Sequence, residues 1–383
     1  MIYLDNAATS FPKPKCVIQA VTHFLTNTGS NPGRSANINS IEAGRILYNA
    51  RKNLSELVGQ KDIFRTIFTL NATMAINSCL HGILKENDNV LVTSLEHNSL
   101  IRPLKELEKT RNINIKITPS SNICKLDYEK AKELAKGCKL IAFVHANNVT
   151  GAILPIEFFK NLAKENGSYL LVDASQSLGF ENIDITKNEI DFLCASTHKG
   201  LYAPMGLGFF SFSKKIKIDE FKSFYQGGTG SRSEEIIQPE FLPDKYESGT
   251  LNMPSIAGLE KSLEWIKDIG IHNIKNHEQN MRKILLDELK NIVNIKICEV
   301  DESLDTTGVL SFYFENINIS NAATMLNEKY KIQTRFGLHC SPLTHESIGT
   351  LNNGGTIRLS SSYFTTENEI EKSINAIKEI ANA

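Results

Sequence analysis

The stretch "STHKGLYAPMGLGFF" (Ser196–Phe210) contains a lysine in an unusual place. Lys199 stands between a histidine and a glycine, directly after the apolar run "IDFLCAS" (Ile190–Ser196). The run predicts a buried strand, and the glycines and proline after Lys199 predict a loop. A lysine that only keeps a surface soluble usually lies on a charged helix face. An amine at the end of a core strand therefore raises the question of what it does there.

Around this stretch, apolar strand-like runs alternate with helical patterns from about residue 65 to residue 212. Alternating strands and helices indicate βαβ units and a mostly parallel sheet. Continuous apolar runs such as "LIAFV" suit strands that are covered on both faces. Residues 213–250 are rich in loops, and the remainder has α+β character, so we predict a change of domain near residue 255.

Length, composition and charge exclude several classes of protein. The chain has 383 residues, of which 41% are hydrophobic and 22% charged, as in an ordinary globular protein. Its net charge of -1 gives no electrostatic reason to expect nucleic acid or an anionic membrane as a partner. No apolar run is long enough for a transmembrane helix, and the first residues lack the apolar stretch of a signal peptide. The default expectation is a cytoplasmic protein.

The cysteines do not predict a metal site. They are seven in number, and no two have the short spacing of a zinc site. In a reducing compartment most should be small buried hydrophobic residues. Cys340 differs, because it lies in the polar loop "RFGLHCSPLTH" beside His339 and near Arg335, where a thiolate is favoured. On these surroundings alone, a reactive thiol and a bystander thiol are equally good readings.

Polar residues follow several of the predicted strands, where ligands bind in open α/β sheets. Each alone is better explained as a helix cap or a satisfied buried group. Together they describe a cleft with an anion site, a flat base, a carboxylate and an amine. This combination meets the needs of pyridoxal phosphate: a lysine for the Schiff base, a carboxylate for the ring nitrogen and a helix N-terminus for the phosphate. The residues are Ala72, Thr73, His97, Asn148, Asp173, Gln176, Ser196, His198 and Lys199.

Four segments of the chain resemble a known family. The segments "YLDNAATS" (Tyr3–Ser10), "VDASQSLG" (Val172–Gly179), "STHKGLYAPMGLGF" and "RFGLHCSP" (Arg335–Pro342) are similar to the class V aminotransferase fold of pyridoxal phosphate enzymes. More narrowly, the chain resembles type II cysteine desulfurases, the group that includes selenocysteine lyases. The resemblance runs from residue 2 to about residue 365 and implies fold type I. It implies a large α/β domain over residues 15–254 and a small α+β domain from residues 1–14 and 255–383.

The resemblance also implies roles for individual residues. Lys199 would form the Schiff base, Asp173 would pair with the pyridine nitrogen, Gln176 would contact the phenolic oxygen, and His97 would stack on the ring. The phosphate would be held by Thr73, Ser196 and His198, and by the backbone of Ala72, which stands where the family usually has a threonine. Family members are homodimers with a shared site, so Thr229 and Thr250 are expected to complete the phosphate site of the other subunit. Arg358, with Asn148 as a second contact, would bind the substrate carboxylate.

In the resembling family, the loop of Cys340 carries the nucleophile that takes sulfur from L-cysteine. We therefore expect L-alanine and a persulfide on Cys340, which a sulfur-acceptor protein could receive. The alternatives are a selenocysteine lyase, a C–S lyase or an aminotransferase on the same fold, and, more remotely, a non-catalytic scaffold. The segment after Cys340 departs from the well-known members. Its His345 is expected to be a solvated loop residue, although a substrate contact is an alternative.

Overall fold

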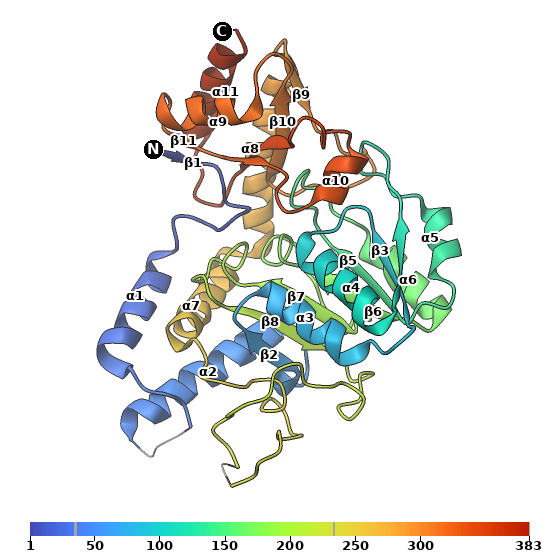
Figure 1. Ribbon diagram of the computed structural model, residues 1–383. Helices are drawn as coiled ribbons and strands as arrows, with labels where there is room; N and C mark the ends of the chain where they lie inside the picture. Colours follow the sequence, from blue (N-terminus) through green and yellow to red (C-terminus); the bar gives the residue numbers. More distant parts are fainter. Residues whose placement is uncertain (34–36, 233, 383) are drawn as a thin grey trace.

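A seven-stranded sheet forms the centre of the larger part of the protein in the computed structural model, which describes residues 1–33, 37–232 and 234–382 (Figure 1). The strand order is β2-β8-β7-β6-β5-β3-β4. From β7 to β4 neighbouring strands are parallel, whereas β8 is antiparallel to both β7 and β2. The prediction of a mostly parallel sheet is confirmed. The strands are β2 (Thr66–Thr69), β3 (Asn89–Thr93), β4 (Asn114–Thr118), β5 (Leu140–Val144), β6 (Tyr169–Asp173), β7 (Phe192–Ser196) and β8 (Gly208–Phe212).

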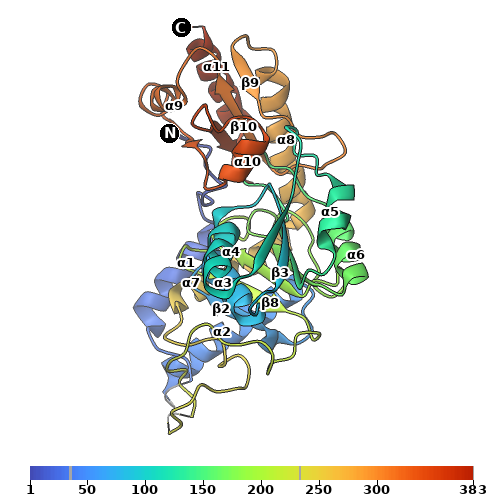
Figure 2. The ribbon, with the colours of Figure 1, turned by 45° about the vertical axis from the view of Figure 1, so that its right-hand side comes forward.

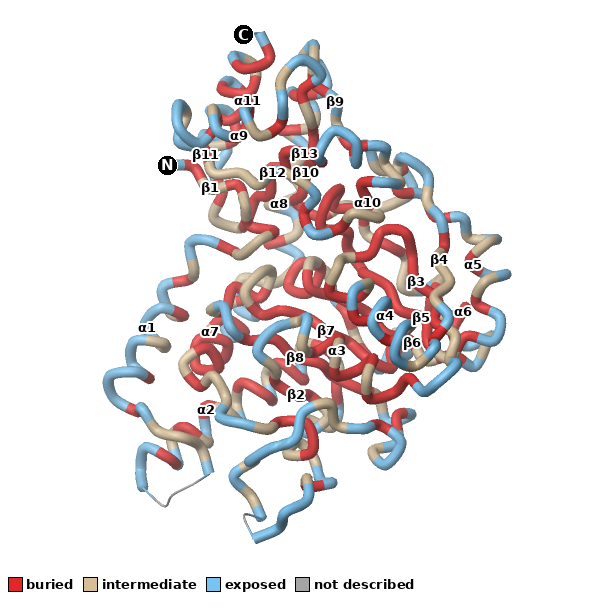
Figure 3. Tube along the Cα trace, viewed as in Figure 1, coloured by how far each residue is buried: buried red, intermediate tan, exposed pale blue. Residues whose placement is uncertain are grey.

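Helices cover both faces of this sheet, which explains the continuous apolar runs. Every residue of β5, β7 and β8 is buried. Figure 3 shows the buried tube concentrated in these strands. Each fully buried Leu, Ile or Phe side chain contributes about 1.5–3 kcal/mol to the hydrophobic stabilisation. Around the sheet lie α2 (Ile38–Leu57), η2 (Ile63–Arg65), α3 (Ala72–Ile83), α4 (Asn98–Arg111), α5 (Tyr128–Ala135) and α6 (Ile156–Asn166).

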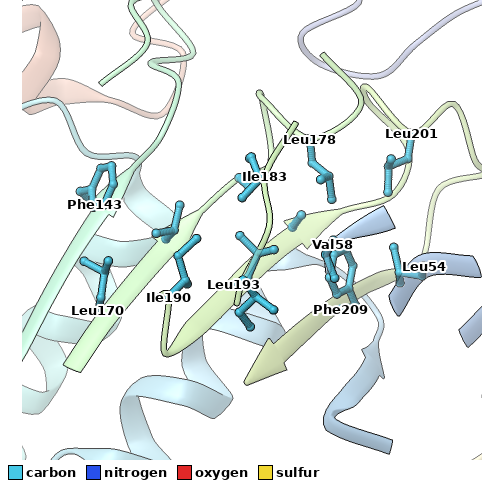
Figure 4. Packing of buried hydrophobic residues seen from close by; sticks show 14 of the residues in the cluster. Leu54, Val58, Phe143, Leu170, Leu178, Ile183, Ile190, Leu193, Leu201 and Phe209 are labelled. Atoms are coloured by element: carbon cyan, nitrogen blue, oxygen red, sulfur yellow. The ribbon is translucent and has the colours of Figure 1, made fainter. Parts of the chain in front are cut away.

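Successive residues of a strand contribute to two different cores. On β7, Leu193 packs in one core cluster and Cys194 in the other, as the alternation of side chains requires. Figure 4 shows the first cluster, where Leu193 and Phe209 lie beside Leu54 and Val58 at the end of α2. The sheet is therefore the middle layer of three layers.

A smaller part of the protein is built around a four-stranded antiparallel sheet with the order β12-β13-β10-β9. The N-terminal strand β1 joins this part through parallel pairing with β11, so residues far apart in sequence share one core. Figure 2 shows this part above the larger one, with α10 between them. Its elements are β1 (Ile2–Tyr3), α8 (Ile271–Leu289), β9 (Ile295–Ile297), β10 (Val309–Phe314), α9 (Ile319–Glu328), β11 (Ile332–Gln333), β12 (Arg335–Gly337), α10 (Pro342–Ser347), β13 (Thr356–Ser360) and α11 (Glu367–Ala381).

Helix α7 (Met253–Ile269) bears on the predicted domain boundary. Its residues Ile256 and Leu263 belong to the same core cluster as the large sheet, and the helix packs against α1 and α2. The division into two domains stays a prediction, and this packing favours a boundary after Ile269 instead of one near residue 255.

Helices α1 (Lys15–His23), η1 (Phe24–Thr28) and α2 were not predicted from the sequence. None of the helices in the described part of the chain combines the length and apolar character that crossing a membrane requires.

Candidate active site

A cavity opens at the carboxyl ends of the parallel strands, at the position expected for ligands in this type of sheet. About 520 Å³ of it is not filled by protein atoms, and part of this volume is open to solvent. The cavity brings together the residues that the sequence predicted from separate strand ends. It is lined by Asn71, Ala72, Thr73, His97, Ser99, Val144, Asn148, Asp173, Ser175, Gln176, Ser196, His198 and Lys199.

Lys199 follows β7 and lies inside the cavity. Burial lowers the pKa of its amine from 10.5 to about 8. The negative charge of Asp173 opposes this shift, while Arg358 and Arg335 lower the pKa further. The neutral, nucleophilic fraction of the amine near neutral pH is therefore much larger than that of an ordinary lysine.

Asp173 is the last residue of β6 and is only 3% exposed. Its Oδ1 accepts a hydrogen bond from the backbone N–H of Ser175 at 2.9 Å, and its Oδ2 accepts one from Ser99 Oγ at 3.5 Å. These bonds fix the carboxylate at the cavity wall. Gln176, which follows Ser175, donates a hydrogen bond from Nε2 to the carbonyl oxygen of Ala7 at 2.9 Å.

His97 caps the N-terminus of α4, where its Nδ1 accepts the backbone N–H of Ser99 at 3.0 Å. Burial lowers the pKa of His97 to about 4, with a further contribution from the charge of Lys199. The ring is therefore neutral, with Nδ1 as an acceptor.

Glu96, the residue before His97, was missed by the sequence analysis. It is 1% exposed, and burial raises the pKa of its carboxyl group to about 8. Its Oε1 accepts a hydrogen bond from Thr93 Oγ1, and its Oε2 accepts one from the backbone N–H of Val144 at 2.9 Å. The side chain thus joins the ends of β3 and β5. A carboxylate directly before His97 at a strand end was the available signal.

One corner of the cavity has the chemistry of an anion site. Helix α3 begins there at Ala72, and its N-cap is Asn71, whose side chain accepts the N–H of Met74, not Thr73. Two buried polar atoms that line this corner, Ser196 Oγ and His198 Nδ1, have no hydrogen-bond partner among the described residues. A group with several acceptor oxygens, such as a phosphate, would satisfy them together with the helix N-terminus.

Gly208 allows β8 to approach this corner closely. A Cβ at this position would lie 2.4 Å from the backbone carbon of Asn71 and 2.7 Å from the nitrogen of Ala72. The start of α3 and the end of β7 can therefore share one corner only because residue 208 has no side chain.

Cys340 lies at the turn between β12 and α10, and its side chain is exposed, as the sequence predicted. Its Sγ is 3.7 Å from Nη2 of Arg335, and its carbonyl oxygen accepts the N–H of Asn98 at 2.8 Å. Asn98 follows His97, which lines the cavity, so this contact places the turn of Cys340 beside the cavity that contains Lys199. The expectation of a solvated His345 is wrong, because His345 lies in α10, is fully buried and hydrogen-bonds Thr350.

Arg358 extends from β13 and is 1% exposed. Its Nη2 pairs with Asp5 Oδ1 at 2.8 Å, and its Nη1 donates to the carbonyl oxygen of Asn148 at 2.9 Å. Its Nε has no partner among the described residues. Arg335 pairs with Arg358 in the register of β12 and β13, which brings a second guanidinium to the same site.

Four predicted site residues do not line the cavity: Cys340 and Arg358, described above, and Thr229 and Thr250. The two threonines lie in the loop-rich segment between β8 and α7. Thr229 Oγ1 lies 3.1 Å from Ser231 Oγ, which is consistent with turn chemistry. Their predicted role belongs to the site of a second subunit and stays a prediction.

Known proteins resemble this chain over nearly its whole length. The family model "Aminotransferase class-V" matches residues 2–372. A probable cysteine desulfurase of Methanothermobacter thermautotrophicus is 29% identical over 99% of this chain and 94% of the relative. A cysteine desulfurase of Haloferax volcanii is 28% identical over 98% of this chain and 88% of the relative.

A solved structure supports the same assignment. The apo structure of a cysteine desulfurase from Thermococcus onnurineus superimposes with a TM-score of 0.92 at 26% identity, covering 100% of this chain and 94% of the other. The predicted fold is confirmed. The chain belongs to the class V aminotransferase family, whose members generally depend on pyridoxal phosphate.

Proposed function

We propose that this protein is a pyridoxal phosphate-dependent cysteine desulfurase that converts L-cysteine to L-alanine and leaves a persulfide on Cys340. The observation that carries the proposal is that the Lys199 amine and the Asp173 carboxylate line one cavity, to whose wall the turn of Cys340 is tied. Asn148, which lines the same cavity, hydrogen-bonds the residues on both sides of Cys340. An aminotransferase needs the amine and the carboxylate but has no use for the thiol. The curated relatives named above are described as cysteine desulfurases, which supports this choice.

The residues present fit the cofactor. When bound, pyridoxal phosphate supplies an aldehyde that condenses with amines and a ring that withdraws electrons from the substrate Cα. The phosphate would satisfy the free Ser196 Oγ and His198 Nδ1 at the start of α3, with Thr73 and the backbone of Ala72. The remaining expected contacts are those of Asp173 with the ring nitrogen, Gln176 with the phenolic oxygen and His97 with the ring face.

Lys199 and Cys340 would carry out the chemical steps. With a pKa of about 8, the Lys199 amine can accept the proton that leaves the substrate Cα and return it later. The Cys340 thiolate would attack the substrate sulfur, so that an S–S bond forms while the bond between sulfur and Cβ breaks. Protonation of Cβ then completes alanine. Arg358, with Arg335 close by, would bind the substrate carboxylate.

A second copy of the chain would complete the site. Helices α1, η1 and α2 carry large apolar side chains that are exposed in the single chain, which supports a homodimer. In such a dimer, Thr229 and Thr250 would reach the phosphate of the neighbouring subunit. Because Cys340 is exposed, its persulfide would be accessible to a sulfur-acceptor protein. The exposed apolar residues are Ile18, Leu25, Ile38, Ile41 and Tyr48.

The test is to incubate the protein with pyridoxal phosphate and L-cysteine and to measure alanine and the protein mass. We expect alanine together with a gain of one sulfur atom on the peptide that contains Cys340. Cys340→Ser should abolish both, while Cys16→Ser, which changes a partly exposed thiol outside the cavity, should change neither. Free sulfide with undiminished turnover in Cys340→Ser would instead identify a C–S lyase. Much faster turnover of selenocysteine would identify a selenocysteine lyase.

A further inference from the structure

The side chain of Asn148 holds the chain on both sides of Cys340. Its Nδ2 donates to the carbonyl oxygen of His339 at 2.7 Å, and its Oδ1 accepts a hydrogen bond from Ser341 Oγ at 2.6 Å. Asn148 is 4% exposed and Ser341 is fully buried, so both bonds are shielded from water. A residue in the turn after β5 thus binds the two neighbours of a residue almost two hundred positions further along the chain.

The backbone of the turn at His339 and Cys340 must be held in place by contacts with the rest of the protein. His339 and Cys340 have φ values of +49° and +59°, so two successive residues with side chains occupy the left-handed region. This conformation is unfavourable for residues other than glycine, and it persists only where the surrounding structure holds it. Besides the two bonds to Asn148, the N–H of Asn98 holds the carbonyl oxygen of Cys340 at 2.8 Å.

The same residue also contacts the predicted carboxylate-binding group. The carbonyl oxygen of Asn148 accepts a hydrogen bond from Nη1 of Arg358 at 2.9 Å. One asparagine therefore joins Arg358 to the turn that presents Cys340. A role of Asn148 as a substrate contact alone would not explain its side-chain hydrogen bonds to His339 and Ser341.

We propose that Asn148 is a positioning residue that holds Cys340 in the orientation needed for sulfur transfer. The inference rests on the proposed role of Cys340 as the group that accepts sulfur. It makes Ser341 its partner in the same task, because the only hydrogen bond of the Ser341 hydroxyl among the described residues goes to Asn148. A small displacement of a reacting group is enough to slow a reaction strongly.

The neighbouring pair Asn147 and Thr344 provides a matched control. Asn147 Nδ2 donates to Thr344 Oγ1 at 2.9 Å, and this bond also joins the segment after β5 to the segment after Cys340. Thr344 is fully buried but does not flank Cys340. Thr344→Val therefore removes a similar contact without loosening the turn itself.

The experiment compares Asn148→Ala, Ser341→Ala, the double variant and Thr344→Val as cofactor-loaded enzymes. We expect each of the first two to lower the rate of persulfide formation on Cys340 about tenfold, with KM for L-cysteine changed less than about twofold. The double variant should be no slower than Asn148→Ala, because Asn148→Ala already removes the hydrogen bond that Ser341→Ala removes. Thr344→Val should retain the rate within about twofold. Amide hydrogen exchange of residues 337–341 should be faster in the first three proteins and unchanged in Thr344→Val.

Three outcomes would overturn the inference. A raised KM for Asn148→Ala with an unchanged rate and a silent Ser341→Ala would make Asn148 a direct substrate contact. Faster exchange of the turn with normal persulfide formation would make the two bonds merely structural. Absence of any sulfur adduct in the unaltered protein would overturn the proposed function and the sulfur-transfer role together, and the exchange measurement separates that result from the first two.

Discussion

The lowered pKa of Lys199 can be measured in the protein without cofactor. Burial moves the pKa of the amine from 10.5 to about 8. At pH 7 an amine with a pKa of 8 is about 9% neutral, whereas one with a pKa of 10.5 is about 0.03% neutral. Lys199 should therefore react with an amine-acylating reagent about 300-fold faster than an equally accessible ordinary lysine, because only the neutral amine attacks.

The assay is trace acylation of the cofactor-free protein at a series of pH values, followed by mass spectrometry of the peptide that contains Lys199. Exposed lysines serve as the internal reference. The labelling of Lys199 should have its midpoint near pH 8. Asp173→Asn should move the midpoint lower, because the carboxylate favours the protonated amine, and Arg335→Gln should move it higher, because the guanidinium disfavours it.

Two results would refute this reasoning. A midpoint near 10.5 would mean that the amine is not buried as described. A midpoint raised by Asp173→Asn would mean that the carboxylate does not act on Lys199. The same shift has a consequence for stability: between about pH 8 and pH 10.5 the unfolded chain binds a proton that the folded chain does not. The Lys199 contribution to the free energy of unfolding should therefore increase with pH across this interval.

Three further predictions concern the framework and the thiol. Glu247→Ala should lower the free energy of unfolding by about 3–5 kcal/mol in urea titrations, because it leaves the buried guanidinium of Arg51 without its carboxylate partner. Arg51 Nη1 and Nη2 now lie 2.7 and 2.8 Å from the two carboxylate oxygens of Glu247. A loss below about 1 kcal/mol would contradict this prediction. Gly179→Ala should weaken pyridoxal phosphate binding at least tenfold in absorbance titrations. The new Cβ would lie 2.1 Å from the carbonyl oxygen of Gly200, next to Lys199, the proposed Schiff-base residue; unchanged affinity would show that the segment can shift at little cost. Arg335→Gln should slow the alkylation of the Cys340 thiol by iodoacetate several-fold, while Arg335→Lys should retain most of the rate. Equal rates in the unaltered protein and both variants would exclude the guanidinium as the partner of the sulfur.

The sequence alone identified the sheet and most of the residues at its edge. Continuous apolar runs predicted β5 and β7 as buried strands, because strands covered on both faces need apolar side chains on both. Parallel strands end at one edge, so the polar residues after them were expected to meet. Lys199, Asp173 and His97 do meet there.

Only the tertiary structure decided how these groups are held and paired. Arg358 pairs with Asp5, Asn148 holds the turn of Cys340, and His345 is buried instead of solvated. Each of these facts depends on contacts between segments that are distant in sequence or on how a short helix packs, and neither the period of a strand nor that of a helix encodes such contacts. Periodicity reports which face of an element is buried, whereas the partner that covers the face is fixed only when the whole chain packs.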